Sequence, residues 1–100
     1  MAKQIIWSLS AQKDKKEILK YWSQRNKSNR YSKKLNQLFK DSIRLLREHP
    51  YIGKSTNDDS VRIKIVKEYL LIYEITETSI NILSIWDGRK DPSKLDKILK

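Results

Sequence analysis

A chain of 100 residues is the size of one small domain, and we expect residues 1–100 to fold as a single unit with a thin core. A hydrophobic content of 38% with a charged content of 34% excludes a disordered chain and an integral membrane protein. The absence of cysteine excludes disulfides and thiol chemistry, and the single histidine excludes histidine-pair zinc motifs. We therefore expect no metal and no other cofactor.

The net charge of +10 is unevenly distributed along the chain. Residues 1–50 carry 13 basic and 4 acidic side chains, whereas residues 51–100 carry 9 and 8. The basic half predicts an acidic partner, which is a nucleic acid, an anionic surface or an acidic protein, unless it is only a solvated helical surface. The N-terminus lacks the apolar run of a signal peptide and no segment has the length of a membrane span, so we expect a cytoplasmic protein without membrane contact.

The first expected strand covers residues 3–9, in which Ile5, Trp7 and Leu9 alternate onto one face. Ser8 or Ser10 then offers the N-cap of a helix over residues 11–25.

A second helix is expected over residues 29–48, after a short polar link, and Pro50 ends it. Its apolar residues recur at steps of three and four over five turns, and the short link predicts an antiparallel helix hairpin. The apolar residues of this second helix are Tyr31, Leu35, Leu38, Phe39, Ile43 and Leu46.

Residues 51–60 are expected to form a polar loop, followed by strands over 61–66, 69–76 and 79–86. Two-residue connections between these strands predict an antiparallel β-meander. Residues 93–100 offer a short terminal helix. The expected fold class is therefore α+β with the order βααβββ, in which the two-helix hairpin packs on one face of the sheet and leaves the other face open.

Charged and apolar residues alternate along residues 61–66. Val61, Ile63 and Ile65 share one face, and the other face carries Arg62 and Lys64. We expect Arg62 and Lys64 to project from the open face of the sheet.

The order of elements and four segments together resemble the RelE/ParE superfamily of type II toxins. The segments are Ile6-Trp7-Ser8-Leu9-Ser10-Ala11, His49-Pro50-Tyr51-Ile52-Gly53, the strand pair over 61–75, and residues 80–92, which end in Asp87-Gly88-Arg89-Lys90-Asp91-Pro92. The resemblance implies a growth-inhibiting toxin of the plasmid-stabilisation type. It also implies a cognate antitoxin, acidic and partly disordered when free, that silences the toxin in a hetero-oligomeric complex.

Two molecular targets are known in this superfamily. RelE-like members are mRNA interferases that cut message on the ribosome, and ParE-like members poison DNA gyrase. A RelE-like nuclease is a metal-independent enzyme that stabilises a phosphorane with cations on the sheet. Arg62 and Lys64, with Cα atoms about 7 Å apart, and Arg89 are the candidate catalytic residues. The alternatives are a solvated sheet face for Arg62 and Lys64, and pairing with Asp87 or Asp91 for Arg89.

Two departures favour a ParE-like, non-nuclease mode. Leu70 stands where RelE-like nucleases place an arginine, and residues 87–100 contain no tyrosine, although those nucleases end in a catalytic one. The ending at residues 88–92 is nearer to the ParE-like pattern. The ribosome-dependent nuclease is the first alternative, and a basic nucleic-acid-binding module without toxin activity is the second.

The basic helices form a separate candidate surface for nucleic acid or for the acidic antitoxin. Its members are Lys13, Lys16, Lys20, Arg25, Arg30, Lys33 and Lys34.

Overall fold

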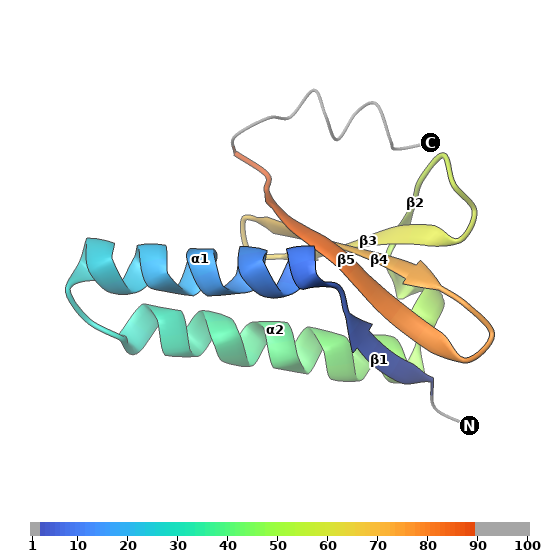
Figure 1. Cartoon of the computed structure of the whole chain (residues 1–100), viewed down its shortest axis with the longest axis horizontal. Helices are drawn as coiled ribbons and strands as arrows, with labels where there is room; N and C mark the ends of the chain where they lie inside the picture. Colours follow the sequence, from blue (N-terminus) through green and yellow to red (C-terminus); the bar gives the residue numbers. More distant parts are fainter. Residues whose placement is uncertain (1–2, 90–100) are drawn as a thin grey trace.

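A computed structural model of the chain describes residues 3–89, and its elements follow the expected order with two additions (Figure 1). The expected terminal helix over 93–100 lies outside the described residues. No helix of the described part is both long and apolar enough to span a membrane. The elements are β1 (Gln4–Trp7), α1 (Leu9–Asn26), α2 (Arg30–Glu48), the 3₁₀ turn η1 (Pro50–Ile52), β2 (Lys54–Ser55), β3 (Val61–Val66), β4 (Tyr69–Ile75) and β5 (Ser79–Asp87).

The first strand is shorter than expected because the helix after it begins early. Ser8 is the N-cap, and its Oγ accepts a hydrogen bond from the Ala11 N–H at 2.9 Å. Leu9 is therefore the first residue of α1, and it is 84% exposed. The prediction that Leu9 shares a strand face with Ile5 and Trp7 is wrong.

The five strands form one sheet in the order β1-β5-β4-β3-β2. The meander of β3, β4 and β5 is confirmed as antiparallel. However, β1 lies parallel to β5, with Gln4 opposite Ser79 and Trp7 opposite Ile82, so the sheet is mixed. A parallel pair requires a long crossover connection, and here it contains both helices. In addition, β2 pairs with β3 inside the expected loop.

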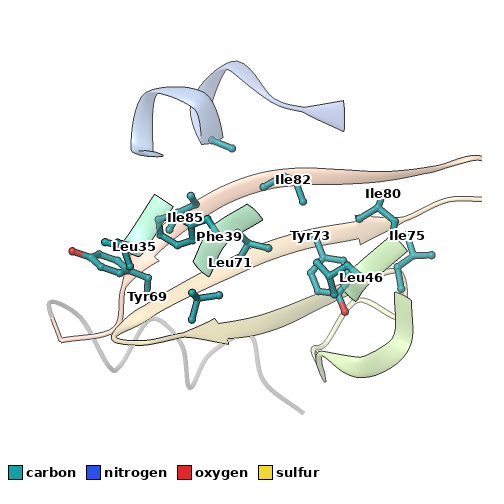
Figure 2. Packing of buried hydrophobic residues seen from close by; sticks show 12 residues of the cluster. Leu35, Phe39, Leu46, Tyr69, Leu71, Tyr73, Ile75, Ile80, Ile82 and Ile85 are labelled. Carbon is teal, nitrogen blue, oxygen red and sulfur yellow. The ribbon is translucent and has the colours of Figure 1, made fainter. Parts of the chain in front are cut away.

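The expected helix hairpin packs on one face of this sheet, and the main core lies between the two layers (Figure 2). Leu35, Phe39 and Leu46 of α2 are fully buried, as the helical period predicts. In α1 only Ala11 is fully buried. The strands contribute Val66, Tyr69, Leu71, Tyr73, Ile75, Ile80, Ile82 and Ile85 to the same cluster.

A register shift in the β4–β5 pairing changes which side chains of β5 face the helices. Ile82 and Ile85 both join the main core although they are three residues apart. The start of α1 fixes this irregular segment, because the Ser8 hydroxyl donates to the Leu83 carbonyl at 2.8 Å and Asp14 Oδ2 accepts from the Ile85 N–H at 3.0 Å. Leu83 consequently lies on the face of the sheet away from the helices, in a second cluster.

Candidate functional site

The face of the sheet opposite the helices carries a second apolar cluster, which we call the outer-face cluster. Ile63, Leu70 and Ile72 are 1%, 6% and 5% exposed, although α1 and α2 pack on the other face (Figure 2). The partly buried Val61, Leu83 and Trp86 complete it. Next to it is a groove of about 340 Å³, lined by Val61, Ile72, Leu83, Ser84, Trp86 and the loop residues Thr56, Asn57 and Asp58.

The prediction that Arg62 and Lys64 project from the open face is wrong. Arg62 lies opposite Tyr73 and Lys64 lies opposite Leu71, and both of these partners belong to the helix-side core. The alternation along β3 was predicted correctly, but the two faces were interchanged. Both cations remain half-buried rather than fully covered. Near the edge of a sheet, a side chain can point toward the helix layer and still reach water.

Arg62 binds backbone carbonyls in the segment that follows α2. Its Nη1 donates to the carbonyl oxygens of Tyr51 at 3.1 Å and Gly53 at 2.8 Å. The guanidinium carbon also lies 5.1 Å from the centre of the Tyr51 ring. Through these contacts Arg62 links β3 to the segment that contains η1. Binding of a phosphate by Arg62 and Lys64 stays a prediction.

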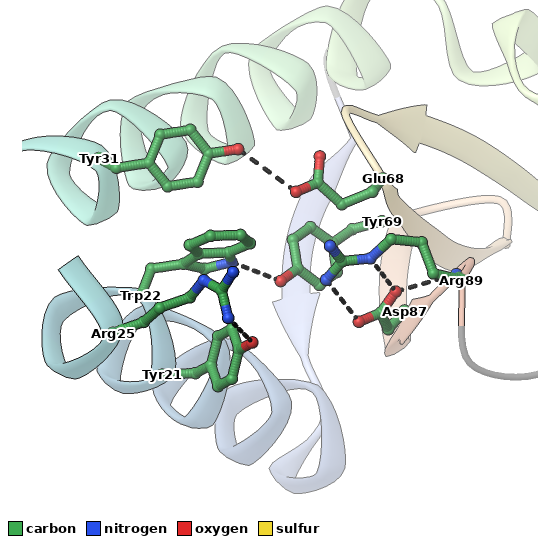
Figure 3. Close-up of polar contacts among 8 residues, drawn as sticks. All are labelled: Tyr21, Trp22, Arg25, Tyr31, Glu68, Tyr69, Asp87 and Arg89. Carbon is green, nitrogen blue, oxygen red and sulfur yellow. Dashed lines mark hydrogen bonds and ion pairs between the residues drawn. The ribbon is translucent and has the colours of Figure 1, made fainter.

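Arg89 lies just past the end of β5, away from Arg62 and Lys64 in the sheet order, and it pairs with Asp87 (Figure 3). Its Nε and Nη2 donate to the two carboxylate oxygens at 3.1 and 3.0 Å, and its backbone N–H donates to Oδ1 at 2.9 Å. These bonds raise the pKa of Arg89 above its ordinary value. The structural alternative for Arg89 is confirmed with Asp87 as the partner, and a catalytic role of Arg89 stays a prediction.

An aromatic cluster joins α1 and α2 to the β3–β4 turn beside Arg89 (Figure 3). The Trp22 indole N–H donates to the Tyr69 hydroxyl at 2.6 Å, and the Trp22 and Tyr31 rings meet edge to face at 4.8 Å. The Tyr31 hydroxyl donates to Glu68 Oε1 at 3.4 Å. This cluster was not predicted from the sequence, because the spacing of Trp22, Tyr31 and Tyr69 along the chain gives no sign that they meet.

The basic helix surface is present as expected. Its seven cations are all exposed, with four on α1 and three at the start of α2. Lys13, Lys16 and Lys20 follow one another on α1 at steps of three and four, so they share a face of that helix. No cluster of three potential metal ligands occurs among residues 3–89.

Burial raises the pKa of Tyr69, and burial and the neighbouring Glu68 raise the pKa of Tyr31. In the unfolded chain a tyrosine loses its proton near a pH of about 10. Above that pH the unfolded state binds fewer protons than the folded state, so the free energy of unfolding should fall as the pH rises through the raised values. Urea unfolding followed from about pH 9 to 11 tests this. A Tyr69→Phe variant should lose one late step from the phenolate absorbance titration, and an unchanged titration would contradict the assignment.

Comparisons with known proteins agree with this architecture. A family model described as the ParE toxin of the type II toxin–antitoxin system, parDE, matches residues 5–92. No curated protein sequence matches the chain significantly. A solved structure of the chromosomal ParDE toxin–antitoxin system from P. aeruginosa is similar with a TM-score of 0.70 and 16% identity, over 84% of this chain and 94% of that one. The E. coli DinJ-YafQ toxin–antitoxin complex is similar with a TM-score of 0.60 and 15% identity, over 89% and 96% of the two chains. At such identities the two structures establish the fold.

Proposed function

The chain belongs to the ParE toxin family of type II toxin–antitoxin systems, and on this premise we propose that it arrests bacterial growth by binding DNA gyrase through the outer-face cluster. A cognate antitoxin keeps it silent in a toxin–antitoxin complex. Since gyrase is an enzyme of the bacterial cytoplasm, the toxin acts there.

The observation that carries this proposal is the apolar character of the outer face. The partly buried Val61, Leu83 and Trp86 offer the accessible apolar surface of the groove. They pack against the buried Ile63, Leu70 and Ile72. Protein interfaces are enriched in aromatic and aliphatic anchors at their centre, whereas recognition of a phosphate backbone requires Lys and Arg. A surface of this composition suits a protein target better than an RNA substrate.

The charged residues on β3 support the same choice of target. A nuclease needs cations that are free to meet a phosphate on an accessible face. Arg62 instead donates both bonds of its Nη1 to backbone carbonyls, on the helix side of the sheet. Leu70, at the position where the RelE-like pattern has an arginine, lies within the outer-face cluster.

The antitoxin partner is proposed from the family and from charge. Both similar structures are toxin–antitoxin systems or complexes. Seven exposed cations on the two helices attract an acidic chain, which gains its ordered structure on binding.

Induction of the chain in bacteria, without and with its antitoxin, tests the proposal. Growth should stop only without the antitoxin. Plasmid recovered from arrested cells should be relaxed or cleaved, while the messenger RNA remains intact. Message cut at codons with normally supercoiled plasmid would reject the gyrase target in favour of the ribosome, and undisturbed growth would reject toxicity altogether.

A further inference from the structure

The centre of the outer-face cluster is buried more deeply than the sheet alone explains. Ile63, Leu70 and Ile72 are at most 6% exposed, although both helices pack on the other face of the sheet. Side chains stand roughly perpendicular to a sheet, so neighbouring strands cover their flanks and leave their ends to another layer. No helix among residues 3–89 contributes a side chain to this cluster. Another segment must therefore lie over its centre.

The covered area is narrow. Ile65 lies opposite Leu70 in the β3–β4 pairing, and yet it is 45% exposed. Val61, Leu83 and Trp86 are only partly buried and line the accessible groove. The covering segment therefore lies over the middle of the cluster and leaves the groove beside it open.

The chain leaves β5 next to this covered area. The Gly88 N–H donates to the Glu68 carbonyl oxygen at 2.8 Å, which holds Gly88 beside the start of β4. A Cβ atom at Gly88 would lie 3.7 Å from Leu70 Cγ, so Gly88 borders the Leu70 side chain on the outer face. Residues 90–100 begin two positions later, outside the described part of the chain.

The sequence of residues 90–100 has the pattern of a short amphipathic helix. Ser93-Lys94-Leu95-Asp96 matches a capping box, in which a serine begins a helix and an acidic residue follows three positions later. Leu95, Ile98 and Leu99 share one face of a helix that begins there, and Lys97 and Lys100 lie on the opposite face. The segment therefore offers one apolar face to a surface and one charged face to water.

The length of this segment fits the width of the outer face. A helix over residues 93–100 is about 12 Å long. The path from β5 across β4 to β3 covers two strand spacings, or about 10 Å. Residues 90–92, which include Pro92, are long enough to turn the chain from the end of β5 onto the sheet.

We propose that residues 93–100 form an amphipathic helix that covers the centre of the outer-face cluster of the same chain, with Leu95, Ile98 and Leu99 facing the sheet. The helix makes a third layer and leaves the groove at Leu83 and Trp86 as the accessible apolar surface. This inference does not depend on the proposed function, but it restricts the surface on which a target can bind.

Methyl nuclear Overhauser spectra of the full-length wild-type protein test the proposal directly. Cross-peaks should join the methyl groups of Ile98 to those of Leu70 and Ile72, and they should persist in a sample diluted with unlabelled protein. Cross-peaks that arise only between labelled and unlabelled chains would assign the cover to a second copy. The absence of any cross-peak from Ile98 to the sheet would place residues 93–100 elsewhere, and either result would overturn the proposal.

Thiol labelling gives an independent test, because the chain has no cysteine and Leu70→Cys introduces a unique one. This thiol should react slowly with an aromatic disulfide reagent in the full-length chain. Leu95→Ser combined with Ile98→Ser should make the reaction at least about tenfold faster, because the cover loses its apolar contacts and opens locally. The matched pair Lys97→Ser and Lys100→Ser should leave the rate unchanged.

A thiol on the helix-side face separates local opening from unfolding of the whole domain. Leu71 is fully buried under the helices, so Leu71→Cys should stay protected when Leu95 and Ile98 are replaced. Equal acceleration at Leu70→Cys and Leu71→Cys, or no acceleration at Leu70→Cys, would overturn the proposal.

Discussion

Gly53→Ala should destabilise the fold by about 3 kcal/mol or more. A Cβ atom at this position would lie 2.5 Å from Tyr73 Oη and 2.9 Å from the Ile63 carbonyl oxygen. The backbone of Gly53 has φ −71° and ψ 164°, which any residue adopts. The substitution is therefore unfavourable because there is no space for a Cβ atom, and not because of the backbone conformation. The Tyr73 hydroxyl donates to the Pro50 carbonyl at 2.6 Å and accepts from the Gly53 N–H at 3.0 Å. The fully buried ring therefore has no alternative position.

Urea denaturation of the wild type and of Gly53→Ala measures this effect. Lys54→Ala, at the exposed neighbouring position, is the control and should change the free energy of unfolding by less than about 0.5 kcal/mol. If Gly53→Ala were as mild as the control, the close approach of η1 to β4 would not exist in solution. The hydrogen bonds from Arg62 to the carbonyl oxygens of this same segment would then also be absent.

Leu83→Ala should weaken growth arrest strongly, with an apparent affinity for the target reduced about 30-fold or more. Leu83 belongs to the outer-face cluster and lines its groove. Truncation of an anchor at the centre of a protein interface costs about 2 kcal/mol or more. The hydrogen bond from the Ser8 hydroxyl ends on the Leu83 carbonyl oxygen, so the substitution leaves it in place.

The measurement is the inducer level required to stop growth, with the amount of soluble toxin determined in parallel. Leu9→Ala is the matched control, because Leu9 is 84% exposed on α1. Leu83→Met preserves the apolar volume and should retain toxicity. Full toxicity of Leu83→Ala at equal protein level would remove the outer face from the proposed mechanism.

The sequence was most informative where structure is local. The three- and four-residue spacing of the apolar residues, of which Leu35, Phe39 and Leu46 are fully buried, predicted α2. Two-residue turns predicted the meander. The parallel pairing of β1 with β5 joins segments more than 70 residues apart, and no local pattern specifies it.

The inverted faces of β3 have a similar cause. Alternation shows which residues share a face, and it does not show which face the helices cover. A signal was nevertheless present in Tyr69–Ile75, where Glu74 alone interrupts a run of apolar residues. Such a run is typical of a strand that is buried on both faces, and it could have located the outer-face cluster.

The candidate site likewise contains some contacts that residue spacing predicts and others that it does not. The pairing of Arg89 with Asp87 was one of two alternatives open to the sequence analysis, because residues two apart at a strand end meet readily. The bond between Trp22 and Tyr69 and the two carbonyls bound by Arg62 are tertiary contacts. They depend on how the helix layer and η1 pack against the sheet, and composition and residue spacing do not specify that packing.

The supercoiling reaction of purified DNA gyrase, with a ribosome-containing translation reaction run in parallel, tests the proposed target. We expect the wild-type toxin to block supercoiling at amounts close to those of the enzyme, whereas Leu83→Ala should not. Message in the translation reaction should stay whole. Normal supercoiling together with ribosome-dependent cleavage of the message would contradict the proposed target.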